Sequence, residues 1–212
     1  MNLIIMKIYH YTNYCALKKI LKIMCLKYGN FKNTNDPSEF LRYSSVPYSA
    51  LVQVDKSLVF ETFYTKVHSY KPLSFSIDGG RPGWQLPCMW AHYGDNHKGV
   101  CIELDLEKLS IDKIMHAKIK YIESIPVCNF LMNYTGKEKT FSEIVDNYIS
   151  HNMTTLFFSK EQDWESEQEY RLIAINENSV LNIENAITGI YLGARFEKSV
   201  RTIRSYINKL RL

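Results

Sequence analysis

The chain has 212 residues, 46% of them hydrophobic, and a formal net charge of +4, which is typical of one globular domain, so we expect a single domain over residues 1–212. The composition excludes a low-complexity or disordered chain, and the apolar runs fall short of the ~20 residues that cross a bilayer. The first residues lack the features of a signal peptide and the five Cys form no CxxC pair, so we expect a cytoplasmic protein with reduced thiols and no membrane partner.

The first half of the chain contains both alternating and helical apolar patterns. KIYHYT (Lys7–Thr12) alternates and predicts a strand. A helix capped by Thr12 or Asn13 follows, marked by Leu17, Ile20, Leu21 and Met24 at helical spacing. The further elements expected are a short strand at Leu26–Tyr28, a helix from about Pro37 after Asn35 and Asp36, a helix at Lys56–His68 and a strand at Lys71–Asp78.

The second half mixes strands and helices without regular βαβ alternation. We expect helical turns at Pro87–Tyr93, strands at Gly99–Asp105, His116–Ile122, Ser166–Ile175 and Ile187–Leu192, and helices at about Thr140–Phe158 and Val200–Leu210. This order predicts an α+β fold with a mixed, mostly antiparallel sheet and flanking helices.

Two strands carry polar side chains on one face. In YHYT, His10 and Thr12 share one face while Tyr9 and Tyr11 point to the other. In LSFS (Leu73–Ser76), Ser74 and Ser76 make a ledge of two hydroxyls, with Phe75 on the opposite face. A strand histidine is commonly a hydrogen-bonded structural residue, and the alternative is that it donates a hydrogen bond to a ligand hydroxyl or phosphate.

The stretch MWAHYGDNHKGVCIELD (Met89–Asp105) concentrates aromatic and polar residues before a buried strand. Trp90 and Tyr93 offer flat faces for stacking, and His92 lies between them. The spacing of Cys88 and the nearby His residues matches no usual zinc pattern, so we expect no metal. A Cys88 nucleophile with His92 as its base is an alternative, although a helix would bring the two together for packing just as readily.

The stretch WESEQEYRL (Trp164–Leu172) places several carboxylates in alternation. In a strand that begins near Glu165, the side chains of Glu165, Glu167, Glu169 and Arg171 share one face. Like charges on one face cost stability unless they are paired or used in chemistry. Two interpretations follow: ion pairs of Glu169 with Arg171 or Glu167 with Lys160 at a sheet edge, or a catalytic site.

Basic residues gather near both ends of the chain. They are Lys18, Lys19, Lys22 and Lys27 early, and Lys198, Arg201, Arg204, Lys209 and Arg211 late. Such residues are typical of solvated helix faces, and the alternative is a contact with nucleic acid.

Four motifs in order, NDPSE (Asn35–Glu39), LSFS, MWAHYGDNHKGVCIELD and WESEQEYRL, resemble the bacterial family catalogued as domain of unknown function 2971. The resemblance extends from about Tyr9 to Leu192, and the family name implies no function. More distantly, IYHYTNYCALKKILK is similar to the opening of ADP-ribosyltransferases, particularly bacterial toxins that modify nucleic acid and the RNA 2'-phosphotransferases. That superfamily places a His or Arg on its first core strand, a Ser or Tyr motif on a middle strand and a Glu on a late strand, often as ExE or QxE.

The second resemblance implies an ADP-ribosyltransferase-like fold and an enzyme that consumes NAD as its substrate. It implies that Glu169 holds the ribose 2'-hydroxyl and stabilises an oxocarbenium-like transition state, while Glu167 orients or deprotonates the acceptor. The expected NAD-binding residues are His10, Tyr11, Thr12, Ser74, Ser76, Trp90, His92 and Tyr93, with His10 at the adenosine ribose, Ser76 at the nicotinamide ribose and Trp90 or Tyr93 stacked on nicotinamide. Arg42 is only a candidate for the toxins' NAD-contacting Arg.

We therefore expect a toxin or phage-defence effector that transfers ADP-ribose to DNA, RNA or protein, with an antitoxin or defence-operon protein as a further expected partner. One alternative is an NAD glycohydrolase, in which water replaces the acceptor. Another is a non-catalytic nucleotide- or nucleic-acid-binding module, and a plain interaction protein with paired carboxylates is the last.

Overall fold

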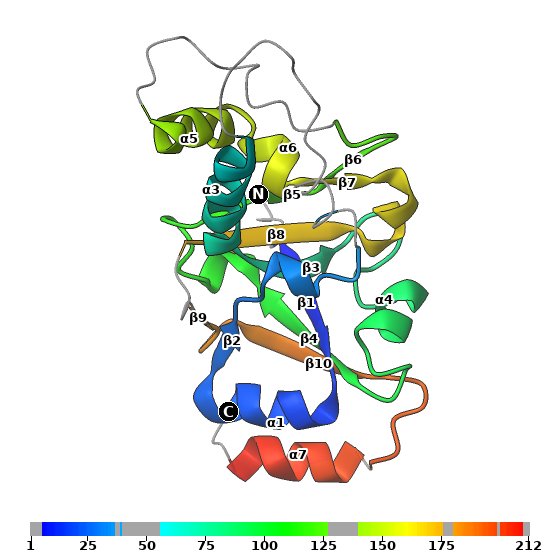
Figure 1. Cartoon of the computed structure of the whole chain (residues 1–212). Coiled ribbons are helices and arrows are strands. Elements are labelled where there is room, and N and C mark those ends of the chain that lie inside the picture. The colour runs from blue at the N-terminus through cyan, green and yellow to red at the C-terminus, as the bar shows by residue number, and fades with distance from the viewer. Residues whose placement is uncertain are drawn as a thin grey trace, which may run out of the picture.

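A six-stranded sheet forms the centre of the structure, in the order β10-β4-β1-β3-β8-β5 (Figure 1). The computed structural model describes residues 6–36, 39, 56–126, 140–175, 180–198 and 200–209. The sheet strands are β1 (Lys7–Thr12), β3 (Lys71–Ile77), β4 (Val100–Asp105), β5 (Met115–Lys118), β8 (Glu169–Ala174) and β10 (Ile187–Leu192). Every neighbouring pair is antiparallel.

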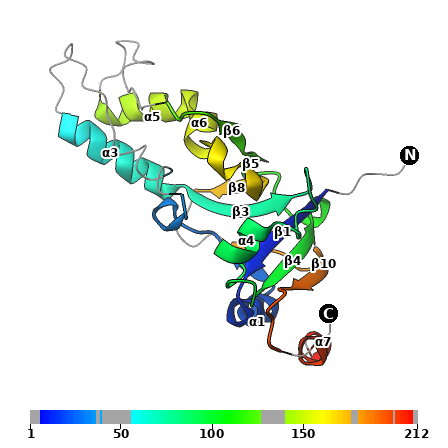
Figure 2. The same cartoon turned by 90° about the vertical axis from the view of Figure 1, so that its right-hand side faces the viewer.

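Helices flank this sheet at both ends (Figures 1 and 2). They are α1 (Tyr14–Ile23), α3 (Lys56–Ser69), α4 (Pro87–His92), α5 (Phe141–His151), α6 (Met153–Phe157) and α7 (Val200–Lys209), with short 3-10 helices η1 (Phe31–Asn33), η2 (Leu106–Lys108) and η3 (Gln162–Glu167). Two small sheets complete the structure: β2 (Cys25–Lys27) pairs with β9 (Val180–Asn182), and β6 (Lys120–Ile122) runs parallel to β7 (Ser159–Glu161). The expected α+β fold with a mostly antiparallel sheet and flanking helices is confirmed. Among the described residues, no helix has both the length and the apolar character needed to cross a membrane.

The alternation of β1 divides the core between the two faces of the sheet. Ile8 is fully buried in an apolar cluster with Leu17 of α1 and Ile102 of β4. Tyr9 and Tyr11 point to the other face and pack with α4. A third cluster lies under α3, α5 and α6. The prediction that Tyr9 and Tyr11 share one face of the strand is therefore correct.

The two central strands, β1 and β3, separate along their length. They pair only at Ile8 with Ile77 and at Tyr9 with Ser76, whereas β1 pairs with β4 along its whole length. Pro72 in β3 has no N–H to donate to a neighbouring strand. Its carbonyl accepts a hydrogen bond of 2.7 Å from the N–H of Gly29, so the loop after β2 takes up part of the free edge. The separation opens a gap near the centre of the sheet.

The expected strand Ser166–Ile175 begins later in the structure, at Glu169. The preceding residues form η3, and Gln168 has a left-handed backbone with a φ of 47°. The side-chain amide of Gln168 donates to the carbonyl of Ile77 at 2.7 Å, which holds this turn against β3. The predicted alternation is therefore wrong for Glu165, which lies in the 3-10 helix and is exposed.

Two other expected elements are broken in the structure. The expected strand His116–Ile122 is divided into β5 and β6, because its hydrogen-bond partner changes. The N–H of Ile119 donates to the backbone carbonyl of Glu169 in β8, whereas the N–H of Lys120 donates to the backbone carbonyl of Phe158. The expected helix Thr140–Phe158 is divided into α5 and α6 at Asn152. Both helices bury side chains in the same apolar cluster, so the apolar spacing continues across the break.

Some expectations fall on residues that the structure does not describe. Of the helix expected from about Pro37, only Glu39 is described, and it is helical. Arg42, the candidate NAD-contacting arginine, also lies outside the described residues. The remaining expected elements are present with bounds shifted by one or two residues.

We expect Ile102→Ala to lower the free energy of unfolding by about 2–5 kcal/mol, because Ile102 is fully buried in the central strand β4 and its loss leaves a cavity. Urea denaturation would measure this. Val180→Ala is the matched control: Val180 is 55% exposed and its truncation should change stability by less than about 0.5 kcal/mol. Equal losses in the two variants would contradict the assignment of the core.

Candidate functional site

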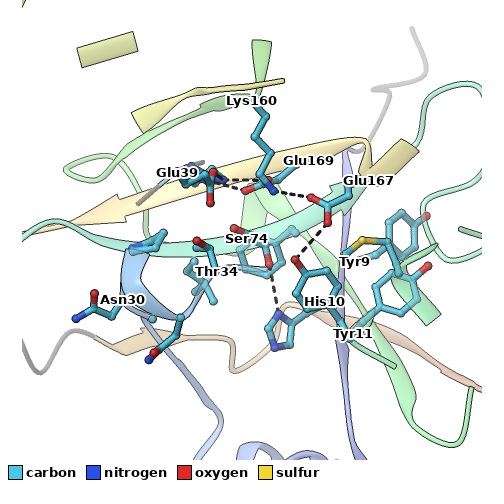
Figure 3. A pocket seen from close by; sticks show the side chains of 18 of the residues that line it. Tyr9, His10, Tyr11, Asn30, Thr34, Glu39, Ser74, Lys160, Glu167 and Glu169 are labelled. Carbon is cyan, nitrogen blue, oxygen red and sulfur yellow. Dashed lines mark hydrogen bonds and ion pairs between the residues drawn. The ribbon is translucent and has the colours of Figure 1, made fainter. Parts of the chain in front are cut away.

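A cavity of about 260 Å³ lies where β1 and β3 separate (Figure 3). Segments far apart in the chain contribute to its walls, among them β1, the loop around η1, β3, α4, β7 and β8. The charged and polar side chains that line it are His10, Lys27, Asn30, Asn33, Thr34, Glu39, Ser74, Tyr93, Lys160, Glu167, Glu169 and Arg171. Because the strands separate, side chains from both faces of the sheet reach the same space.

The floor of the cavity is a buried network of three carboxylates and two cations. Arg171 of β8 is 1% exposed, and its Nε donates to Glu169 Oε1 at 2.6 Å. Its Nη1 donates to the carbonyl of Phe157 at 3.0 Å, and its Nη2 bonds to both Glu169 Oε2 and Glu39 Oε1. The guanidinium therefore joins the central sheet, α6 and the segment that carries Glu39.

Lys160 of β7 is the second cation of this network. Its Nζ lies 2.6 Å from Glu167 Oε2 and 2.8 Å from Glu169 Oε2. The side chains of Lys160 and of both glutamates are 3–4% exposed, so these contacts are shielded from water. Both ion pairs considered from the sequence are present, but they lie in the interior: β8 has a neighbour on each side and is not an edge strand.

The pKa values of Glu167 and Glu169 are shifted in opposite directions. Burial alone would raise the pKa of Glu169, but the charges of Arg171 and Lys160 outweigh it and lower this pKa to about 2. For Glu167, burial raises the pKa and the nearby Glu169 raises it further, against the attraction of Lys160. Glu169 is therefore a fixed anion at neutral pH, whereas Glu167 is the carboxylate more readily protonated.

Tyr93 connects this floor to the end of α4. Its hydroxyl donates to Glu167 Oε1 at 3.2 Å, and burial together with the charge of Glu167 raises the pKa of Tyr93. The phenol therefore stays protonated and acts as a donor to Glu167, while its oxygen can still accept a hydrogen bond from a ligand.

His10 lines the cavity from the separated part of β1. Burial lowers the pKa of His10 to about 4, so its imidazole is neutral at pH 7. Its Nδ1 lies 3.5 Å from the carbonyl oxygen of Ser74 (Figure 3). Assigning the proton to Nδ1 for this contact leaves Nε2 as a hydrogen-bond acceptor.

The structure brings together six of the ten residues predicted for the site. His10, Tyr11, Ser74, Tyr93, Glu167 and Glu169 line the cavity. Thr12, Ser76, Trp90 and His92 are not among its lining residues. Trp90 is 8% exposed and belongs to the core: its indole N–H donates to the carbonyl of Trp84, and its ring meets Tyr11 edge-on. His92 is exposed, and Ser76 is fully buried opposite Glu169 in the sheet register.

Glu39 is the main residue of the floor that the sequence reasoning missed. It is 1% exposed and lines the cavity, and its Oε2 has no hydrogen-bond partner among the described residues. The motif NDPSE predicts the start of a helix and carries part of the family resemblance, but no local signal indicates that its glutamate contacts an arginine 132 positions later. A buried acceptor of this kind is stabilised when a ligand donates a hydrogen bond to it.

The described residues hold no group of three or more His, Cys, Asp or Glu that is arranged to bind a metal ion. The floor itself combines three carboxylates with two cations that face inward. Its net charge favours a ligand group that is cationic or rich in hydrogen-bond donors, and opposes a phosphate at the same depth. Lys27, which is exposed and lines the cavity, is the cation better placed to meet a phosphate.

Residues 89–172 match the family model described as protein of unknown function (DUF2971). The match includes Tyr93, Lys160, Glu167, Glu169 and Arg171, whereas His10, Glu39 and Ser74 lie outside it. No curated protein matches the chain, and neither does any solved structure.

We expect Arg171→Met to lower the free energy of unfolding by about 3–5 kcal/mol, because it leaves Glu39 and Glu169 buried with one cation fewer. Chemical denaturation would measure the change. The control is Lys66→Met, which removes a more exposed ion pair with Asp146 and should cost less than about 1 kcal/mol. A loss no larger than that of the control would mean that the floor network contributes little to folding.

The free energy of unfolding should decrease as the pH falls through the window in which His10 titrates, and His68, whose pKa burial also lowers to about 4, contributes in the same window. The pKa of this imidazole is about 4 in the folded chain and about 6.5 when unfolded, so between these values the unfolded chain binds more protons. The free energy of unfolding therefore decreases as the pH falls from about 6.5 to about 4. Urea denaturation at several pH values should show a shallower decrease for His10→Gln, and parallel curves would contradict the burial of a neutral imidazole.

Proposed function

We propose that the chain is an ADP-ribosyltransferase-like enzyme, in fold and in activity, that binds NAD in this cavity and acts in the cytoplasm. The observation that supports the proposal best is the pair of buried carboxylates whose pKa values lie in opposite directions, Glu167 raised and Glu169 lowered. Paired carboxylates in different environments are a recurrent means of dividing proton transfer and charge stabilisation between two residues.

The proposed step breaks the bond between the anomeric carbon of ribose and the ring nitrogen of nicotinamide. The bonding electrons leave with nicotinamide, which becomes neutral, and positive charge develops on the anomeric carbon. An acceptor hydroxyl or amine forms the new bond to this carbon, and its proton passes to Glu167. The anionic floor stabilises the developing charge more than the ground state, which is the condition for acceleration.

The residues of the cavity divide these tasks as follows. Glu169 is the fixed anion below the ribose, Glu167 is the base, and Tyr93 and Lys160 orient Glu167 through their contacts with its two oxygens. Neutral His10 accepts a hydrogen bond from a ligand hydroxyl. Of the two aromatic residues expected to stack on nicotinamide, Tyr93 lines the cavity and Trp90 does not.

The size and charge of the cavity fit half of a dinucleotide. Its volume of about 260 Å³ is slightly below the ~300–1,000 Å³ of sites that enclose a drug-sized ligand. The cationic nicotinamide riboside half of NAD suits the acidic floor, and the diphosphate would extend toward Lys27. An acceptor in DNA, RNA or protein, a role in a toxin–antitoxin or phage-defence system, and an antitoxin or operon partner belong to the same proposal.

A second candidate is a module that binds a nucleotide without turnover. It is favoured by the contacts of Glu169, whose two oxygens already accept from Arg171, while Lys160 also contacts Oε2. In this case the carboxylates serve mainly to shape the cavity. An NAD glycohydrolase is the variant of the first proposal in which water replaces the acceptor.

We expect the purified chain to release nicotinamide from NAD, and Glu167→Gln to lower the rate at least about 100-fold, because the amide cannot take the acceptor proton. Chromatography of the released nicotinamide measures it. Glu165→Gln is the matched control, since Glu165 is exposed and does not line the cavity. Binding of NAD in calorimetry without release under any condition would support the non-catalytic module, and neither binding nor release would reject both.

Glu39→Gln should weaken NAD binding about tenfold while the chain stays folded. The carboxylate oxygen Oε2 of Glu39 can accept a hydrogen bond from a ligand hydroxyl, whereas the amide of the variant presents an N–H donor at this position. A lost hydrogen bond to a charged group is worth about 1.5–3 kcal/mol. Calorimetry measures the affinity, and the thermal midpoint of unfolding serves as the control for folding. Unchanged affinity would remove Glu39 from the ligand contacts.

A further inference from the structure

Two segments of the chain carry much of its positive charge and none of its negative charge. Residues 14–27 and 198–212 contain nine of the 26 Lys and Arg residues and none of the 22 Asp and Glu residues. The remainder of the chain therefore holds more acidic than basic residues. The mild net charge of +4 conceals this separation.

The fold brings these two segments together. Helices α1 and α7 lie side by side at one end of the molecule in both views (Figures 1 and 2). Ile203 of α7 is buried in the same apolar cluster as Leu17 and Leu21 of α1. The ring of Phe196, just before α7, meets the ring of Tyr14 edge-on at 5.7 Å. Two basic segments separated by about 170 residues thus meet through their helices.

Four basic side chains of the two helices are exposed to solvent. Lys19 and Lys22 of α1 and Arg201 and Arg204 of α7 are exposed, and the ion pairs between described residues include none of the four. We call these four residues the α1–α7 surface. Positive charge concentrated in segments that contain no Asp or Glu is the electrostatic pattern of proteins that contact phosphates.

We propose that the α1–α7 surface binds the sugar-phosphate backbone of a nucleic acid. A lipid membrane fits it less well, because Leu17, Leu21 and Ile203 are used in the core, and the exposed Ile23 alone offers little apolar area for insertion among acyl chains. A protein partner also fits less well, because protein interfaces are depleted in lysine and rely on a central apolar patch. Backbone contacts carry little sequence information, so binding is expected to be largely independent of sequence.

The surface is connected along the chain to the cavity. Lys27, in β2 directly after α1, is the last basic residue of the first segment and also lines the cavity. In this proposal, Lys27 supplies a further phosphate contact at the cavity. The inference that this nucleic acid is the acceptor of ADP-ribose rests on the proposed function, whereas the inference that it binds does not.

The test measures fluorescence anisotropy of a labelled 20-nucleotide RNA and a labelled 20-base-pair DNA, without NAD, from 50 to 200 mM salt. The variant is Lys19→Gln, Lys22→Gln, Arg201→Gln and Arg204→Gln combined. The control removes the same charge from exposed residues elsewhere, namely Lys108→Gln, Lys113→Gln, Lys118→Gln and Lys120→Gln. The thermal midpoint of each variant shows whether it remains folded.

The wild-type chain should bind at least one probe, with the logarithm of the association constant falling linearly as the logarithm of salt rises. Loss of four phosphate contacts should reduce that slope by about three units and weaken binding at least about tenfold at 100 mM salt, because each contact contributes about 0.7–0.9 to the slope. The control variant should keep the wild-type slope.

Three results would overturn the proposal: no binding of either probe by the wild-type chain at 50 mM salt, equal losses in the variant and the control, or binding of vesicles with 30% phosphatidylserine but of neither nucleic acid. The proposed function fails separately. If the chain binds nucleic acid but releases no nicotinamide from NAD, in the presence or absence of the probe, the transferase proposal is rejected and the binding surface stands. Nicotinamide release without nucleic-acid binding would reject the surface and leave the enzyme.

Discussion

The buried guanidinium of Arg171 is the interaction on which the rest of the site depends. Three carboxylates in an interior are tolerated only when cations compensate them, since removing a lone charge from water costs several kcal/mol, a large part of the stability of a domain. Arg171 meets Glu39, Glu169 and a carbonyl of α6 at once, and its planar group has enough donors for all of them. Lysine could not replace it in this geometry.

Lys160 divides its charge between two acids, and this division makes the site asymmetric. Glu169 receives attraction from both cations, whereas Glu167 receives it from Lys160 alone and is repelled by Glu169. Two glutamates separated by a single residue therefore differ in their affinity for protons. The left-handed turn at Gln168 is what places them so, because it lets the end of η3 and the start of β8 face the same ammonium group.

The local patterns of the sequence were reliable where one strand or helix packs regularly. The alternation in KIYHYT predicted β1 and its two faces, and GVCIELD predicted the strand β4, because the two strands pair along their length and pack on both faces of the sheet. They failed in WESEQEYRL, where Gln168 bonds to Ile77 across the sheet and ends the alternation. Glu167, Glu169 and Lys160 were identifiable because they lie within ten residues. Glu39 was not, because its partner is distant in the chain and only the tertiary fold brings the two together.

The separation of β1 from β3 also has a mechanical consequence. The half-sheets β10-β4-β1 and β3-β8-β5 are joined at only two residue positions, so this joint is the narrowest connection across the sheet. A rotation of one half relative to the other would break few hydrogen bonds, yet it would move His10 on one side against Ser74, Glu167 and Glu169 on the other. The width of the cavity is therefore coupled to the angle between the halves, and amide hydrogens at the joint are the ones that such opening exposes to exchange.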